Sequence, residues 1–391
     1  MTKDDILKRI ENAKEKVAAD MQSMFDGLRA EVSKAIDEAK ELSWQEGYKE
    51  CLKSIGQTPV NTEDDEPVKE AEYVLTNPMV AAFMLHKYPD NILTTGKSVV
   101  NDYISRYVVE NDYANNAVEH PLPVNIGTPS DDVYLKGGGH VYQGKGGQIF
   151  NLAPNRTYEG TVGGKAVKLR TVGTVCQIHF EADSFIPNCR DIGGYKAEGG
   201  TVKYRRILRS AELPTIKKDS SLVKVMKDLA VTCEIDLRGE HAYNDLGWRG
   251  YAIGINGYAQ AITSPTKYKE VFERVLKEVK SSGCVILHCH AGADRTGTIV
   301  ALLLALLGVS ASDICKDYEL TCACHWCNFK RIDDERFAEF SQGELRSAFK
   351  KLASLYGTKG ESLQQQAYSW WTKKVGITAQ QVSDFKKAMI G

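Results

Sequence analysis

The segment of this chain best suited to chemistry is a cysteine followed at a distance of six residues by an arginine. It reads Cys289-His290-Ala291-Gly292-Ala293-Asp294-Arg295, with an apolar run, Cys284–His288, before it and a helical pattern after it. Five intervening residues allow the backbone N–H groups to curl around an anion, and the following helix adds its positive N-terminal end. The planar guanidinium of Arg295 can bind two phosphoryl oxygens at once. This spacing therefore predicts a phosphate site.

The same positive field favours the thiolate of Cys289, which could attack phosphorus and form a covalent phosphocysteine. The hydroxyl of Thr296, which follows Arg295 directly, is placed to hydrogen-bond the sulfur, and we expect His288 to orient the loop. The remaining loop residues, expected to surround the bound phosphate, are His290, Ala291, Gly292 and Ala293.

These residues carry a family resemblance. The segment resembles the signature loop of cysteine-based phosphatases and, more narrowly, that of the bacterial tyrosine phosphatase family, Cys-x2-Gly-x-Asp-Arg-Thr-Gly. Three upstream blocks resemble the same family in the same order: Asn188-Cys189-Arg190-Asp191-Ile192-Gly193-Gly194-Tyr195, Leu208-Arg209-Ser210-Ala211-Glu212-Leu213 and Ile235-Asp236-Leu237-Arg238. Gly308-Val309-Ser310 and Lys316-Asp317-Tyr318-Glu319-Leu320 also match. The resemblance covers about residues 184–390.

The resemblance implies activity on phosphotyrosine, and in some members on phosphoserine, phosphothreonine or phosphoinositides. It implies that Cys289 is the nucleophile, that Arg295 binds phosphate and that Asp294 is the general acid, with Asp236 and then Asp245 as the next candidates. Asp294 could instead only brace the loop. Arg190 and Arg238 could contact substrate or could pair with Asp191 to order the loops. Phosphoinositide-active members often have lysine where Ala293 stands, which argues against a polyanionic lipid headgroup.

Elements with α/β patterning must position these residues. We expect strands at Val202–Leu208, Val231–Leu237 and Cys284–His288. Helical spacing predicts helices at 219–229, from Ser264-Pro265 to about Lys280, at Thr296–Leu307 before Gly308, and from Ser310 onward, with C-terminal helices around 333–356, 361–375 and 378–390.

The sequence divides into four parts. Residues 1–55 predict one long helix with an eleven-residue apolar repeat, suited to coiled-coil self-association or to packing on its own domain. Residues 56–120 read as a linker and a helical segment, and 121–183 as a small β-module of alternating strands, in which Asn151–Tyr158 is similar to a segment of fibronectin-like sandwiches. Residues 184–391 are the expected phosphatase domain. The predicted fold class is thus α/β, a cysteine-phosphatase-like sheet flanked by helices, preceded by a β-sandwich-like module and a long helix.

Composition limits the function further. Apolar residues make up 42% and charged residues 26% of 391 residues, and the net charge is −1, so a nucleic-acid partner is not expected. We expect no membrane span, no signal peptide and therefore a cytoplasmic location, although particle association or export by another route stays open. No cofactor is expected, because Cys322, Cys324 and Cys327 make an incomplete zinc set. The main alternative to a protein phosphatase is a non-catalytic protein with a phosphatase-like head on an oligomeric stalk, for example within a larger particle.

Overall fold

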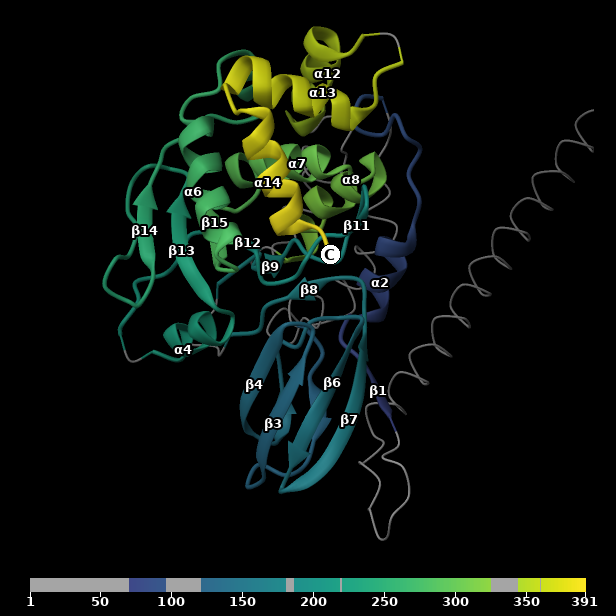
Figure 1. Cartoon of the computed structure of the whole chain (residues 1–391), viewed down its shortest axis with the longest axis vertical. Helices are drawn as coiled ribbons and strands as arrows, with labels where there is room; N and C mark the ends of the chain where they lie inside the picture. Colours follow the sequence, from purple (N-terminus) through teal and green to yellow (C-terminus); the bar gives the residue numbers. More distant parts are fainter. Residues whose placement is uncertain (1–69, 96–120, 181–185, 219, 325–343, 359) are drawn as a thin grey trace, which may run out of the picture. The chain divides into compact units, whose positions relative to one another are not determined.

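The computed structural model describes residues 70–95, 121–180, 186–218, 220–324, 344–358 and 360–391. The predicted long helix at 1–55 lies outside the described residues, as do residues 325–343, which include Cys327. The rest is a mixed α/β structure (Figure 1).

The part of the chain that carries the cysteine loop is built on a six-stranded sheet in the order β14-β13-β15-β12-β9-β8. The first four strands run parallel, and β9 and β8 are antiparallel to their neighbours. Their bounds are β8 Cys176–Gln177, β9 Arg190–Asp191, β12 Ile207–Ser210, β13 Val231–Asp236, β14 Arg249–Ala252 and β15 Cys284–His288. Because β15 lies inside the parallel part, its carboxyl end opens at the centre of the sheet edge where ligands of such sheets bind.

Both faces of this sheet are buried. On β15, Val285 and Leu287 belong to one apolar cluster, and Cys284 and Ile286 belong to another on the opposite face. This is the continuous apolar pattern of a central parallel strand, and it confirms the predicted strand at Cys284–His288.

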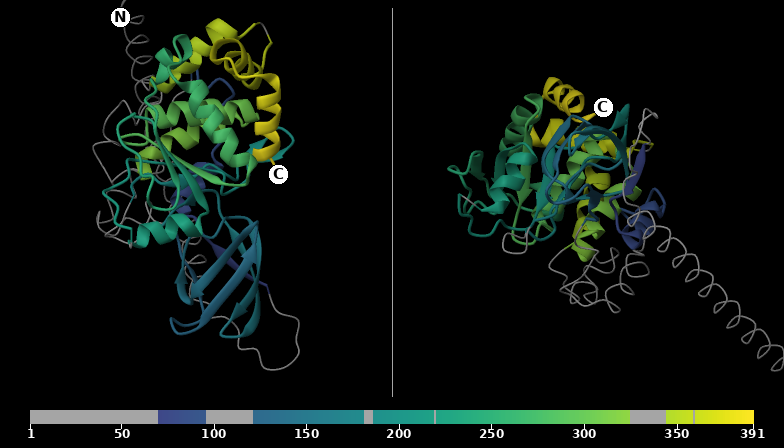
Figure 2. Two further views of the ribbon diagram at one scale, coloured as in Figure 1. Left: turned by 60° about the vertical axis from the view of Figure 1, so that its left-hand side comes forward. Right: turned by 90° about the horizontal axis from the view of Figure 1, so that it is seen from below.

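Helices cover the two faces unequally. Helix α4 (Ser221–Asp228) covers the smaller cluster. The larger cluster is covered by α6 (Tyr268–Lys280), α7 (Arg295–Leu307), α8 (Ala311–Glu319) and the C-terminal helices. Figure 1 shows these helices grouped together with α4 apart from them, and Figure 2 shows the grouping from two further directions. The remaining helices are α5 Tyr258–Thr263, α9 Thr321–Cys324, α12 Glu344–Tyr356, α13 Leu363–Ser369, the π-helical η3 Trp370–Val375 and α14 Ala379–Met389.

Several helix boundaries follow from local sequence. Gly308 takes a left-handed φ of +83° and ends α7, as the apolar run followed by glycine predicted. Ser310 caps α8 by accepting a hydrogen bond from the N–H of Asp313. The helix predicted at 361–375 is α13, which begins at Leu363 and is continued by η3, with Ser362 in a capping box.

Two expected boundaries are wrong. The helix predicted to open at Ser264-Pro265 begins at Tyr268, because the preceding helix α5 runs to Thr263 and Lys267 takes a left-handed φ of +57° directly before α6. The strand predicted at Val202–Leu208 is β12, Ile207–Ser210, and Val202 forms only an isolated bridge to Ile390. In both places tertiary pairing overrides the local pattern.

The β-module contains a five-stranded sheet, β1-β7-β6-β3-β4, and a two-stranded sheet, β2-β5. Residues 71–74, within the predicted linker and helical segment, form β1 and pair with β7, and the helical spacing at Val80–Met84 corresponds to α2. The bounds are β1 Ala71–Val74, α2 Pro78–Leu85, β2 Val124–Ile126, β3 Asp132–Gly137, β4 His140–Lys145, β5 Gly147–Ile149, β6 Arg156–Val162 and β7 Lys165–Val172. Two short strands that follow β9 in the sequence, β10 Lys196–Ala197 and β11 Gly200–Thr201, form a hairpin.

Both sheets of the module contribute to one apolar core, in which Tyr158 is fully buried. Its hydroxyl accepts a hydrogen bond of 2.9 Å from the N–H of Ala153, five residues upstream. Tyrosine corners of immunoglobulin-like sandwiches make this type of contact. The fibronectin-like interpretation of the module stays a prediction.

Candidate active site

The predicted phosphate loop connects the carboxyl end of β15 to the first turn of α7. Cys289 is 2% exposed and follows the buried His288, whose carbonyl accepts a hydrogen bond of 2.8 Å from the N–H of Leu237. Arg295 is the first residue of α7 and is half-buried. The structure thus brings the cysteine, the loop and a helix N-terminus together as the sequence predicted.

Three consecutive carbonyl groups of the loop are held by outside partners. The His290 carbonyl accepts from the N–H of Glu212 at 3.0 Å, that of Ala291 from Asn188 Nδ2 at 3.0 Å, and that of Gly292 from Arg209 Nη2 at 2.7 Å. In a trans peptide the C=O and the N–H of the next residue point in opposite directions.

The N–H groups of residues 291, 292 and 293 therefore point away from those partners. In the part of the chain that the structure describes, they have no hydrogen-bond partner. Consecutive N–H groups that point to one side form an anion-binding nest.

The loop requires glycine at position 292. Its φ is +67°, and an added Cβ would stand 2.3 Å from the carbonyl oxygen of Ser210 on β12. A side chain there would push the loop off the sheet and separate Arg209 from the carbonyl it holds.

A buried ion cluster supports the loop from behind. Arg209 donates through Nη1 to Asp317, while Arg190 donates to Oδ1 of Asp317 at 3.3 Å and to its backbone carbonyl at 2.6 Å. The two arginine side chains are 0% exposed and that of Asp317 is 3% exposed. Arg190 also donates to the side-chain oxygen of Asn188, the residue that holds Ala291. One carboxylate of α8 thus organises both side chains that turn the loop.

The charge of Asp317 is maintained by these neighbours. Burial by itself would raise the pKa of this carboxyl, but Arg209 and Arg190 outweigh the burial, and the pKa lies below its ordinary value. Asp317 is therefore ionised and balances one of the two buried guanidinium charges.

His288 is held by a second buried set of polar groups. Its Nε2 lies 3.1 Å from Oε1 of Glu234, and Oε2 of Glu234 accepts hydrogen bonds from Trp248 Nε1 at 2.9 Å and from the N–H of Tyr243 at 3.0 Å. This arrangement fits the predicted orienting role of His288.

Asp236 and Arg238 are engaged with each other beside the loop. Asp236 is fully buried and accepts hydrogen bonds from the N–H and Nε of Arg238 and from the N–H of His241. Burial would raise the pKa of Asp236, but these donors outweigh it and lower that pKa. Arg238 also pairs with Glu212, whose other oxygen lies 3.0 Å from Nδ1 of His290.

Asp294 is held at both its backbone and its carboxyl group. The hydroxyl of Thr298 donates to its carbonyl at 2.8 Å, and the hydroxyl of Tyr258 donates to its Oδ1. The other aspartates predicted as acids or supports lie elsewhere. Asp245 is exposed and 3.2 Å from Lys218, and Asp191 accepts from the N–H groups of Arg205 and Gly193.

Thr296 is fully buried on the first turn of α7, and among the described residues its hydroxyl has no hydrogen-bond partner. An available donor at this position fits the predicted contact with the sulfur of Cys289. Ala293 is also fully buried, so its methyl group faces protein rather than solvent.

Sequence reasoning assigned no role to five residues that shape this site: Asn188, Arg209, Glu234, Tyr258 and Asp317. Asn188, Arg209 and Asp317 stand in the blocks that carry the family resemblance, which was the available indication. Arg190 and Asp191 do not pair with each other; each has its own buried partner, Asp317 and Arg205.

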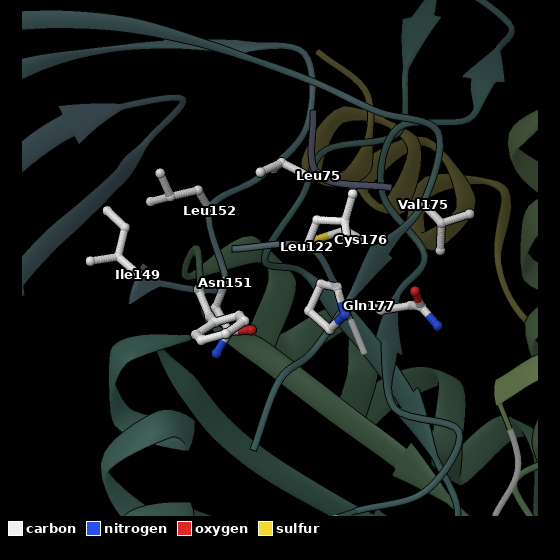
Figure 3. Close-up of a pocket in the computed structure, with 10 residues that line it drawn as sticks. Leu75, Leu122, Ile149, Asn151, Leu152, Val175, Cys176 and Gln177 are labelled. Carbon is white, nitrogen blue, oxygen red and sulfur yellow. The ribbon is translucent and has the colours of Figure 1, made fainter. Parts of the chain in front are cut away.

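The described residues offer no cluster of histidine, cysteine or carboxylate side chains that could hold a metal ion, and no helix among them is long and apolar enough to cross a membrane. A small pocket lies where the β-module meets β8 (Figure 3). It has room for about one water molecule, and none of the residues that line it belongs to the loop. The pocket is therefore a feature of packing.

The site therefore combines a buried cysteine at the end of a central parallel strand, loop N–H groups that point to one side, and the N-terminus of a following helix. The tyrosine phosphatase family matches residues 184–391, more than half of the chain. The chain belongs to the tyrosine phosphatase family, which is a family of phosphatase enzymes.

Two relatives illustrate the likeness. A tyrosine-protein phosphatase of Nostoc commune is 27% identical over 133 residues, which cover 32% of this chain and 44% of that protein. A Cupriavidus necator protein provisionally named a tyrosine-protein phosphatase is 26% identical over 171 residues, covering 36% of this chain and 62% of that protein. The alignments thus span about half the length of these relatives, and they favour a phosphatase over a non-catalytic stalk protein.

The buried cluster predicts a stability effect. Asp317→Asn leaves two buried guanidinium groups with one partner charge removed, and we expect a loss of about 3–5 kcal/mol in the free energy of unfolding. Asp228→Asn, which breaks an exposed pair with Lys224, is the matched control and should cost at most about 1 kcal/mol. Urea denaturation of both variants measures the difference.

The difference should depend on pH. Because the folded-state pKa of Asp317 is lowered, its stabilisation is complete above the unfolded-state pKa of about 3.9 and is lost as pH falls through the folded value. The wild type should therefore approach the Asp317→Asn variant in stability below about pH 4. A gap that is the same at pH 3 and pH 7, or one below about 1 kcal/mol at neutral pH, would contradict the cluster's role.

Proposed function

We propose that this protein hydrolyses phosphoric monoesters through a phosphocysteine on Cys289. The observation that carries the proposal is the set of three consecutive loop N–H groups turned toward one side, beside a buried cysteine and a helix N-terminus. Such a nest binds the three non-bridging oxygens of a phosphoryl group without any movement of the loop. Arg295, the first residue of α7, would complete the binding of these oxygens.

The reaction proceeds in two steps. The thiolate of Cys289 attacks phosphorus, an S–P bond forms, the bond from phosphorus to the ester oxygen breaks, and that oxygen takes a proton from the carboxyl group of Asp294. Water then attacks the phosphocysteine and gives a proton to the Asp294 carboxylate. The S–P bond breaks, and inorganic phosphate and the thiolate are released.

The geometry supports Asp294 as the acid more than the other two candidates. Asp236 is fully buried and accepts hydrogen bonds from Arg238 and His241 as a carboxylate, and Asp245 is exposed and paired with Lys218. Asp294 stands in the loop itself, one residue before Arg295.

We assign Arg190 and Arg238 to support of the loop instead of to direct substrate contact. The Arg190 guanidinium is fully buried on Asp317, and Arg238 is engaged by Asp236 and Glu212. A phosphate could reach either one only by displacing a carboxylate.

The proposed substrate is a phosphotyrosine-containing protein, with dual specificity as the wider possibility. The names of the relatives support this class, and so do Ala293 in place of a loop lysine and the carboxylates of Glu212 and Glu240 around Arg238. Rates on phosphotyrosine peptides, phosphoserine peptides and phosphoinositides test it. A preference for phosphoinositides would overturn the substrate class while leaving the mechanism standing.

Cys289→Ser should abolish turnover and retain vanadate binding. A serine hydroxyl is far harder to ionise than a thiol, while the nest and Arg295 are unchanged. Hydrolysis of p-nitrophenyl phosphate and vanadate titration measure the two properties. Residual turnover near the wild-type rate would rule out the covalent mechanism.

Arg295→Lys should lower kcat/KM by roughly 10²-fold or more, although the charge is kept. A point ammonium cannot make the two parallel hydrogen bonds of a guanidinium to phosphoryl oxygens. The variant is assayed with p-nitrophenyl phosphate, and Lys224→Arg on the exposed face of α4 serves as the control. A near-normal Arg295→Lys enzyme would show that Arg295 lies outside the phosphate site.

Asp294→Asn should slow aryl phosphates with poor leaving groups most, since good leaving groups need little protonation. A leaving-group series on both proteins measures the effect. If Asp294 only braced the loop, the loss would be the same for every leaving group. Parallel plots of rate against leaving-group pKa for the two proteins would therefore rule out Asp294 as the general acid.

A further inference from the structure

Tyr258 occupies an unusual place next to Asp294. It is the first residue of α5 and has a φ of +57°, which is a rare and strained conformation for a bulky residue. Its N–H donates to Thr298 Oγ1 at 3.1 Å, and that hydroxyl donates in turn to the Asp294 carbonyl. The strained backbone of Tyr258 is thus tied to the same residue that its side chain reaches.

The side chain contacts one oxygen of the carboxyl group only. The Tyr258 hydroxyl donates to Oδ1 of Asp294. Within the described ranges of the chain, Oδ2 has no hydrogen-bond partner.

Burial, together with Tyr318 and Asp294 as neighbours, raises the pKa of Tyr258 well above its ordinary value. The hydroxyl therefore stays protonated and acts as a donor. While Oδ1 of Asp294 accepts the hydrogen bond from this hydroxyl, the carboxyl group carries its own proton on Oδ2.

We propose that Tyr258 is the positioning residue of the general acid: its hydroxyl holds Oδ1 of Asp294 so that Oδ2 presents the proton to the leaving oxygen. This inference rests on the proposed function, because it needs Asp294 to be the acid. It assigns a role to a residue outside the loop and outside every motif in the sequence.

The arrangement has a consequence for the reaction. Orientation of the carboxyl group matters most when the leaving group needs the proton, so loss of the hydroxyl should harm poor leaving groups more than good ones.

The test is Tyr258→Phe, which keeps the ring and removes the hydroxyl. We expect kcat to fall about tenfold for the poorest aryl leaving group and much less for nitrophenyl. Vanadate affinity should stay unchanged, since the nest is intact. Tyr158→Phe, which removes another buried hydroxyl, bonded to the N–H of Ala153 at 2.9 Å in the β-module, is the matched control and should not alter the slope.

Asp294→Asn and the double variant separate the possible failures. If Asp294→Asn shows the leaving-group dependence and Tyr258→Phe does not, the positioning role is overturned and the proposed function stands. If the Asp294→Asn series is parallel to wild type, the acid assignment falls and this proposal falls with it. In the Asp294→Asn background, the leaving-group effect of Tyr258→Phe should vanish. An undiminished effect there would show that Tyr258 acts by another route.

Discussion

The structure of the site depends on one buried carboxylate, Asp317 on α8. It pairs with Arg209, which holds the Gly292 carbonyl, and with Arg190, which holds Asn188 and through it the Ala291 carbonyl. A nest of N–H groups is an unfavourable backbone arrangement in the absence of an anion, because its dipoles point the same way. Holding the carbonyls from outside allows the loop to keep this arrangement before phosphate arrives, which is the preorganisation that electrostatic catalysis requires.

The sheet supplies the second constraint. Because β12 and β15 are paired in parallel with Ser210 opposite His288, the backbone of Ser210 meets the loop directly, and Gly292 is needed where the two approach. His288 is fixed by Glu234 on the neighbouring strand β13. The proposed nucleophile, Cys289, therefore directly follows a rigid central strand, and the proposed acid, Asp294, directly precedes a buried helix. The relative position of the two is set by the fold.

The local parts of this account could be predicted from sequence. These parts depend only on residues that are close together in the sequence. They are the strand at Cys284–His288, the helix end at the glycine after Leu307, and the loop between the cysteine and the arginine. The supporting cluster could not be predicted in the same way, because Asp317 lies 127 residues from Arg190 and 108 residues from Arg209. The resemblance marked the blocks that contain these residues, but the sequence suggested substrate contact or pairing with Asp191 for Arg190 and indicated no role for Arg209 or Asp317. Arg190 pairs with Asp317 instead of with Asp191. Tyr258 had no local pattern to indicate it.

The central claim is that the loop holds a phosphoryl group on Cys289 during turnover. The most direct measurement is a rapid denaturing quench of the enzyme with an aryl phosphate in the first turnover, followed by mass spectrometry of the peptide that contains Cys289. The account predicts a phosphoryl adduct on Cys289 that forms within the burst and is lost as inorganic phosphate appears. Normal turnover with no adduct, or with phosphate on another residue, would contradict it.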